Sequence, residues 1–392
     1  MIPEMLMKNE SLTSHAVAFN RPLPTAAPFF TQFDPSAAIL GHGAVVGPDG
    51  SVAVSIYAPA AGHVAVWMDG MDPANLLELD KQADGVWTGT LAFVSPGFKW
   101  LCFFVDGAHM IHPAAPVGYG WRRIMNFVDI PDPEATFYLM RDVPHGSVAR
   151  ETYFSTTTGQ FESCLVYTPP NYARDHENEL YPVLYLQHGS GENETVWTFH
   201  GKVNLIMDNL LAEGKATPCI IVMNNGMVQL PDDNGKCQVD PAAFESLLLH
   251  DCIPFINQKY RIRTDKNSCA LAGLSMGSMQ ACSIAFKYPD RFDWVGLFSG
   301  FMRNRFVAQE QNAHLRLLDD AAAFGQTFKL FFRAIGTDDS LMRIFLEDDQ
   351  ICRDKQVSPG QCPIHIRRLY AQGHEWQVWR RCAHDFLQLI FR

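Results

Sequence analysis

The stretch that decides the fold is Ala270-Leu-Ala-Gly-Leu-Ser-Met-Gly-Ser-Met-Gln280. It passes from a short apolar run, through a turn in which glycines flank Ser275, into a helical pattern that reaches about Lys287. A Gly-x-Ser-x-Gly motif with a nucleophilic serine requires this order of strand, sharp turn and helix, because the backbone comes too close for a Cβ. The free N–H groups that begin the helix can stabilise an oxyanion. We therefore predict a nucleophile at Ser275.

A serine hydroxyl needs a base, which in this architecture follows a later strand. The apolar run Ile364 to Tyr370 ends in Gln372-Gly-His-Glu-Trp376, and this places His374 at the end of a predicted strand. His384 is the competitor, but it lies in the stretch Cys382 to Phe391, whose pattern is that of a closing helix. His374 is the expected base.

An acid that orients the imidazole should lie between the serine and the histidine in the chain. The apolar run Phe328 to Ile335 ends in Gly336-Thr-Asp-Asp-Ser340. Asp338 and Asp339 both lie at the right edge of the sheet, so the residues alone leave the acid open between them.

The oxyanion hole requires two N–H donors. The N–H of Met276, which follows the serine, is the first expected donor. The second should come from the turn His188-Gly-Ser-Gly191, which follows the apolar strand Val183 to Leu186, and specifically from the backbone of Gly189 or Ser190.

The second half of the chain alternates apolar runs with helical patterns, which predicts an α/β fold with a mostly parallel, buried sheet. Helices are expected before Gly214 and over 244–256. The predicted strands are Val183 to Leu186, Ile220 to Met223, Ala270 to Ala272, Trp294 to Phe298, Phe328 to Ile335 and Ile364 to Tyr370.

The first third has a different pattern. Val52, Val54 and Ile56 alternate with small or polar residues, and further short alternating runs end in turns such as Asp69-Gly70 and Asp106-Gly107. This pattern predicts a small all-β sandwich. We expect a flexible N-terminus over 1–25, the sandwich over 26–130, a Pro-rich linker over 131–150 and an α/β-hydrolase catalytic domain over 151–392.

Composition limits the function classes. The net charge of −11 over 392 residues argues against nucleic acid as a partner. The 10 cysteines show neither a Cys-x-x-Cys pair nor a zinc-site spacing, so we expect free, mostly buried thiols and neither metal nor cofactor. Residues 1–20 lack the apolar core of a signal peptide, and no apolar run is long enough for a membrane span, so a cytoplasmic location is expected. The oligomeric state stays open, with a homodimer as one possibility.

The catalytic half resembles the family of bacterial feruloyl esterases and enterochelin esterase-like proteins, which are esterase D-like α/β-hydrolases. The resemblance implies that Asp339 is the acid of the triad, because the family places it second after Gly-Thr. The segment 26–130 resembles the glycogen-binding-like, immunoglobulin-type module that often precedes such esterases. The matching stretches of the catalytic half are Tyr181-Pro-Val-Leu-Tyr-Leu-Gln-His-Gly189, Asp208-Asn-Leu-Leu-Ala-Glu-Gly-Lys215, Ala272-Gly-Leu-Ser-Met-Gly277, Gly336-Thr-Asp-Asp-Ser340 and Gly373-His-Glu-Trp-Gln-Val-Trp379; those of the module are Ser55-Ile-Tyr-Ala-Pro59, Gly85-Val-Trp-Thr-Gly89 and Phe104-Val-Asp-Gly107.

Four residues at the same sheet edge are candidates for binding substrate: Trp197, Asn225, Trp376 and Trp379. Indole rings stack well on planar groups, so the tryptophans could line an aromatic acyl pocket, although core packing would place them equally well. The leading expectation is a serine esterase that cleaves hydroxycinnamoyl esters of plant-derived sugars or small phenolic esters. The alternatives are a siderophore trilactone esterase, an acetyl-sugar esterase and, in another class, a non-catalytic carbohydrate-binding protein.

Overall fold

The computed structural model of the protein describes residues 43–92, 94–173, 179–231, 234–303 and 309–392. The chain divides between Thr136 and Phe137 into two compact units, each described by itself. The expected flexible segment 1–25, and residues 26–42 of the expected sandwich, lie outside the described residues.

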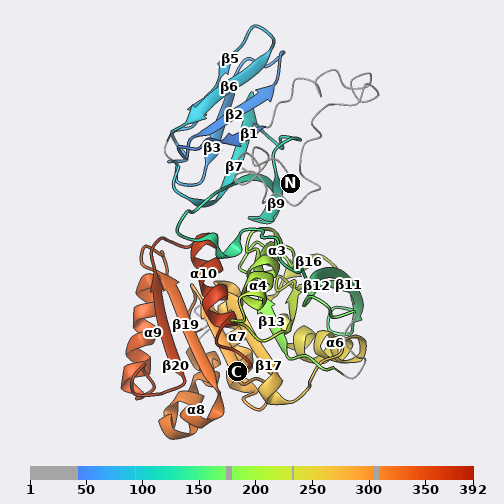
Figure 1. Cartoon of the computed structure of the whole chain (residues 1–392), viewed down its shortest axis with the longest axis vertical. Helices are drawn as coiled ribbons and strands as arrows, with labels where there is room; N and C mark the ends of the chain where they lie inside the picture. Colours follow the sequence, from blue (N-terminus) through green and yellow to red (C-terminus); the bar gives the residue numbers. More distant parts are fainter. Residues whose placement is uncertain (1–42, 93, 174–178, 232–233, 304–308) are drawn as a thin grey trace. The chain divides into compact units, whose positions relative to one another are not determined.

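The first unit is built from strands alone in its described part (Figure 1). One sheet has the order β1-β2-β6-β5, and the other has the order β4-β3-β7-β10-β9 with β8 paired to β7. The strands are β1 (Ala44–Val46), β2 (Val52–Tyr57), β3 (Val64–Met68), β4 (Leu77–Glu78), β5 (Asp80–Lys81), β6 (Val86–Leu91), β7 (Gly97–Val105), β8 (Ala108–Met110), β9 (Val117–Gly120) and β10 (Arg123–Ile130).

The two sheets of this unit share one apolar core. Val54 and Trp87 come from the first sheet, and Val66 and Phe103 come from the second; all four are buried in the same cluster. Burial alternates along β2, which is the period of two that the sequence shows. The prediction of a small all-β sandwich ahead of the α/β fold is confirmed.

The expected linker over 131–150 is not a separate connection. Tyr138 is buried in a short 3-10 turn, and β11 already begins at Ser147. The side chain of Asn209 donates 2.8 Å hydrogen bonds to the carbonyls of Phe137 and Leu139. The prolines suggested an unattached connection, but the backbone of Phe137 and Leu139 is bonded to the helix that carries Asn209. Residues 137–150 belong to the second unit, and residues 131–136 belong to the first.

The second unit contains an eight-stranded sheet with the order β11-β12-β14-β13-β17-β18-β19-β20. The six strands from β14 to β20 in this order run parallel, while β11 and β12 form an antiparallel hairpin that pairs with β14. The six parallel strands are those the sequence predicts, and the hairpin was not predicted. The strands are β11 (Ser147–Ser155), β12 (Gln160–Thr168), β13 (Val183–Gln187), β14 (Ile220–Asn224), β17 (Cys269–Leu274), β18 (Trp294–Phe298), β19 (Leu330–Gly336) and β20 (His365–Tyr370), with a separate hairpin of β15 (Gln229–Pro231) and β16 (Cys237–Val239).

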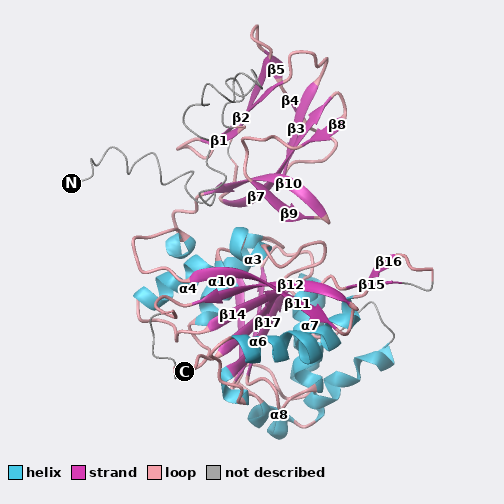
Figure 2. Ribbon diagram, turned by 90° about the vertical axis from the view of Figure 1, so that its right-hand side faces the viewer, coloured by secondary structure: helices cyan, strands magenta, loops and turns pink. Residues whose placement is uncertain are grey.

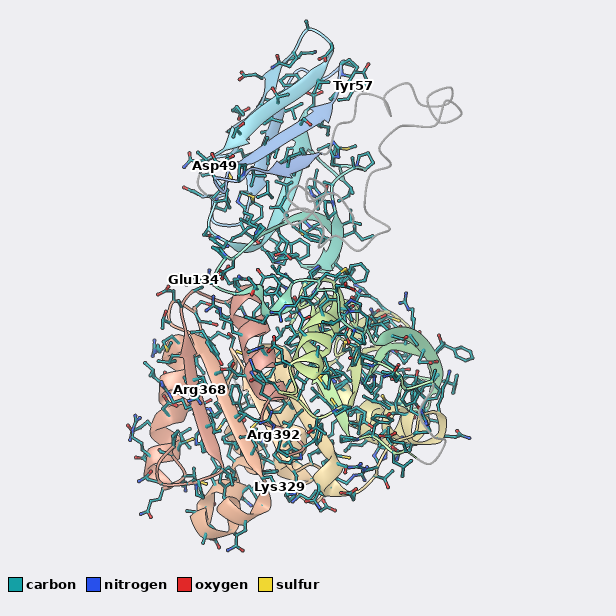
Figure 3. The ribbon with its side chains drawn as sticks, viewed as in Figure 1. Asp49, Tyr57, Glu134, Lys329, Arg368 and Arg392 are labelled. Carbon is teal, nitrogen blue, oxygen red and sulfur yellow. The ribbon has the colours of Figure 1, made fainter. Side chains whose placement is uncertain are left out.

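Helices cover both faces of this sheet (Figure 2). The strands of this sheet are apolar without alternation because both of its faces are covered by helices. In β19, for example, Phe331 packs against Phe286 of α7 and its neighbour Phe332 packs against Phe386 of α10. Side chains fill the layers between sheet and helices (Figure 3). The helices are α3 (Val196–Phe199), α4 (Val203–Ala212), α5 (Phe244–Ser246), which continues through a π-helical turn (Leu247–Cys252) into α6 (Ile253–Lys259), α7 (Met276–Lys287), α8 (Ala321–Thr327), α9 (Met342–Asp354) and α10 (Trp376–Leu387).

The carboxyl ends of the parallel strands meet at one edge of the sheet, because neighbouring parallel strands end side by side. The loops after β13, β14, β17, β19 and β20 therefore share this edge. Within the described ranges, no helix combines the length and the apolar character needed to cross a bilayer. The ten cysteines are free, and most of them are buried.

Candidate active site

Ser275 lies at the sharp turn between β17 and α7. Its backbone has φ 50° and ψ −116°, a conformation that a residue with a Cβ adopts only at a cost in strain. The N–H of Ser275 donates a 2.9 Å hydrogen bond to the carbonyl of Phe298 at the end of β18, and this bond helps to hold the turn. The strained turn presents the serine at the carboxyl edge of the sheet, as the motif predicts.

The two glycines of the motif are required by close backbone contacts. A Cβ on Gly273 would lie 2.5 Å from the carbonyl group of Gly277. A Cβ on Gly277 would lie 2.5 Å from the carbonyl oxygen of His188 in the neighbouring loop. Both clashes would be with backbone atoms, so no side-chain movement could relieve them. Only glycine therefore fits at these two positions of the turn.

A continuous chain of hydrogen bonds joins three of the predicted residues. Nε2 of His374 lies 3.1 Å from Oγ of Ser275. Nδ1 of the same ring lies 3.0 Å from Oδ2 and 3.1 Å from Oδ1 of Asp339. In this arrangement the imidazole can take the proton of the hydroxyl while the carboxylate stabilises the imidazolium that forms.

The two adjacent carboxylates, Asp338 and Asp339, have different surroundings in the structure. Asp339 is 4% exposed, and besides the imidazole it accepts a 2.8 Å hydrogen bond from the N–H of Leu341. Asp338 is exposed, and its N–H donates to the carbonyl of Gln372. The residues alone could not rank these two side chains, because the turn after β19 decides which one points inward.

His384 takes no part in this hydrogen-bonded chain. It lies on α10, where Nδ1 is 3.1 Å from Oδ1 of Asp385 and the ring packs 4.4 Å from that of Phe137. Its place on the closing helix is the one the sequence indicates.

The three predicted oxyanion donors differ in their surroundings. Within the part of the chain that the structure describes, no acceptor is bonded to the N–H of Met276, at the start of α7, or to that of Ser190. The N–H of Gly189, in contrast, donates a 2.8 Å hydrogen bond to Oε2 of Glu192. The prediction that Gly189 offers a free donor is therefore wrong, since a side chain three residues later already occupies it.

His188 orients the peptide that follows Gly189. Burial lowers the pKa of His188 to about 4, so the ring is neutral near pH 7. Nε2 accepts a 2.9 Å hydrogen bond from the N–H of Gly226, so Nδ1 carries the proton and donates to the carbonyl of Gly189 at 2.7 Å. In a trans peptide the carbonyl and the next N–H point in opposite directions, so this contact turns the N–H of Ser190 away from His188.

The predicted aromatic acyl pocket needs correction. The tryptophans 197, 376 and 379 are only 1%, 3% and 6% exposed. Trp376 packs edge-to-face against both of the others, and Trp379 packs edge-to-face against the ring of His374 with centroids 5.0 Å apart. Trp197 also donates through Nε1 to the carbonyl of Gln187. These rings cover one another behind His374 and leave no open indole face for a substrate to stack on.

Asn225, the fourth predicted binding residue, is half-buried in the loop after β14. Its Oδ1 accepts a 3.0 Å hydrogen bond from the N–H of Met227, and its side chain also bonds to His188. This places Asn225 beside the segment 188–195 between β13 and α3, called the oxyanion loop below, where it supports the neighbouring turn.

An apolar cluster that the sequence did not reveal begins at the residue after the serine. Met276 is buried with three side chains from different loops and helices, Met227, Met279 and Phe301. Leu341 and Ile344, which follow Asp339, pack on it and are only partly buried. Met227 and Phe301 lie far in the chain from Met276 and Met279, so no local sequence pattern marks this cluster. Within the described residues, no group of histidine, cysteine and carboxylate side chains could hold a metal ion.

The Esterase family, described as "Putative esterase", matches residues 155–386. The chain is 32% identical over 354 residues to the endo-1,4-beta-xylanase/feruloyl esterase of Xylanibacter ruminicola. That match covers 89% of this chain but 46% of the relative, so the chain spans about half the length of this protein.

Solved structures give the same fold. A ferulic acid esterase is 26% identical with a TM-score of 0.53, and the alignment covers 62% of this chain and 96% of that one. An enterobactin esterase from Shigella flexneri aligns with a TM-score of 0.59 over 92% of this chain and 98% of its own. At 15% identity, the second likeness shows the fold alone.

Proposed function

The chain belongs to the Esterase family, and from this premise we propose that it is a serine carboxylic-ester hydrolase that works through an acyl-enzyme. The observation that carries the proposal is the chain of hydrogen bonds from Ser275 through His374 to Asp339. The three residues lie on loops after β17, β20 and β19, at the carboxyl edge of the sheet.

The proposed reaction follows from these contacts. Oγ of Ser275 attacks the ester carbonyl carbon while Nε2 of His374 takes its proton, and Asp339 stabilises the imidazolium. The N–H groups of Met276 and Ser190 bind the oxyanion of the tetrahedral intermediate. The intermediate collapses as the imidazolium protonates the departing alcohol, and a water molecule activated by His374 then releases the acid and restores the serine.

For the acyl group we propose a hydroxycinnamoyl unit, such as feruloyl, on a plant-derived sugar or a small phenolic ester. Two relatives named as feruloyl or ferulic acid esterases, at 32% and 26% identity, support this choice. The apolar cluster next to Ser275 supports it physically through its partly exposed members Leu341 and Ile344, because apolar side chains that stay accessible gain from covering an aromatic ring. An acetyl group would leave such a surface largely unused.

For the all-β unit we propose an immunoglobulin-type module of the glycogen-binding-like kind. Its two facing sheets and its shared core support this choice. Trp87 and Trp100 are buried in the module and support its packing, whereas Trp121 is 58% exposed.

The test combines labelling with a panel of esters. A fluorophosphonate should form its adduct on Ser275, and Ser275→Ala should abolish both labelling and turnover, with a loss on the order of 10⁴-fold or more. Ser283→Ala, on the same helix α7, is the matched control and should label like the wild type. Methyl ferulate should be cleaved with a higher kcat/KM than an acetylated sugar or a catecholate trilactone. If the acetyl ester or the trilactone has the highest kcat/KM, the proposed acyl group is wrong. If no ester is cleaved, a carbohydrate-binding protein is favoured.

A further inference from the structure

Glu192 brings a carboxyl group to the reacting serine from the oxyanion loop. Its Oε2 accepts the N–H of Gly189 at 2.8 Å. The point that a Cβ on Gly189 would occupy lies 3.2 Å from this oxygen and 3.4 Å from Cβ of Ser275. The carboxyl group and the serine therefore flank the same glycine.

A second contact ties Glu192 to the start of α10, which follows the loop that carries the base. The side chain of Trp376 donates a hydrogen bond to the Glu192 carboxyl, and Trp376 lies two residues after His374. Glu192 keeps part of its surface accessible, and within the described ranges it forms no ion pair. The side chain of Glu192 thus connects the oxyanion loop to the start of α10, and no cation in the described part of the chain compensates its charge.

Taking the serine-esterase function above as given, we propose that Glu192 is a positioning residue that works in its neutral form. By accepting the N–H of Gly189 it holds the loop so that the N–H of Ser190 stays available for the oxyanion. As a neutral group it adds no negative charge next to the tetrahedral intermediate.

The electrostatics around Glu192 favour this neutral form. Burial raises its pKa to about 8, and the hydrogen bonds from Gly189 and Trp376 offset only part of that rise. The titratable neighbours are His188 on the same loop, which is neutral, His374 after β20, and His200 after α3, which packs on Trp376. Glu194, two residues on, is held by Arg150.

The consequence is a loss of activity at alkaline pH. Above the pKa of Glu192, a carboxylate would face the oxyanion within a poorly solvated site, where like charges repel strongly. The rate should therefore fall as pH rises through about 8.

The experiment compares pH profiles of kcat and KM for the wild type and three variants on one soluble ester. Glu192→Ala removes the anchor of the loop, and kcat at pH 6.5 should fall by about tenfold or more with KM changed by less than about threefold. Glu192→Gln keeps an acceptor for Gly189 and cannot ionise, so it should recover most of kcat and lose the alkaline fall. The matched control Glu194→Gln, on the same loop, should keep that fall.

The rate of fluorophosphonate labelling at Ser275, measured over the same pH range, separates this proposal from the proposed function. Labelling does not require that an ester be a substrate, so a protein without esterase activity would still show the alkaline fall in labelling and its absence in Glu192→Gln. An alkaline fall that persists unchanged in Glu192→Gln, or wild-type kcat and labelling in a folded Glu192→Ala protein, would overturn the role of Glu192.

Discussion

Asp338 and Asp339 are neighbours in the chain, but only Asp339 reaches the imidazole of His374. Asp339→Asn should lower kcat on the order of 10⁴-fold, because an amide can hold the ring in the wrong tautomer. Asp338→Asn, the matched change on an exposed residue, should alter kcat by less than about threefold. Steady-state kinetics measure kcat of both variants, and thermal melts show whether they are folded. A larger loss of kcat in Asp338→Asn than in Asp339→Asn would identify Asp338 as the acid.

Substitution of the two histidines near the C-terminus should also have different effects. His374→Ala removes the group within 3.1 Å of Ser275, so turnover should fall about as far as in the serine variant. His384→Ala should mainly lower stability, because this ring packs on Phe137 and bonds to Asp385. Turnover and melting temperature of each variant provide the measurement; a folded but inactive His384→Ala protein would contradict the assignment.

At the scale of elements, the turn between β17 and α7 couples the serine to the oxyanion loop through Gly277. Gly277→Ala would push a Cβ against the backbone of His188, at 2.5 Å. We expect a loss of about 1–3 kcal/mol in the free energy of unfolding, together with reduced kcat, because the loop must shift to make room.

Gly325→Ala in α8 is the control, since the nearest atom to its Cβ would be Sγ of Cys362 at 3.8 Å. This substitution should be neutral or slightly stabilising, because alanine has the higher helix propensity. Denaturant titration of both variants measures the difference. Equal stability of the two variants would show that the turn between β17 and α7 tolerates a side chain at Gly277.

At the scale of the whole molecule, buried neutral histidines should make the protein sensitive to acid. Burial lowers the pKa of His112 in the first unit, and of His188 and His365 in the second, to about 4. In the unfolded chain these rings titrate near 6.5, so between about pH 6.5 and 4 the unfolded state binds more protons. The free energy of unfolding should therefore fall as pH decreases through this window, by up to about 1.4 kcal/mol per pH unit for each ring.

Chemical denaturation at several pH values measures this slope. His365→Gln should flatten the slope for the second unit, because one of the rings that gain a proton on unfolding is gone. A slope that is unchanged in this variant, or stability that rises on acidification over the same window, would contradict the prediction.

Much of the fold and the centre of the site could be predicted from the sequence because their signals are local. Six parallel strands appear as apolar runs, and the glycines around Ser275 mark the sharp turn within five residues. His374 follows a strand directly, so its place at the sheet edge depends on little besides the end of β20. Chain order and strand ends are properties of short segments, and short segments can be read in isolation.

Only the tertiary structure decided which side chains face the site. Asp339 rather than Asp338 points inward because of the turn after β19, and the tryptophans 197, 376 and 379 are buried because α3 and α10 bring them together. The same packing joins the methionine cluster and leaves Gly189 bound to Glu192. The direction of a side chain depends on which distant segments pack against it, and the pattern of one segment carries no information about its partners.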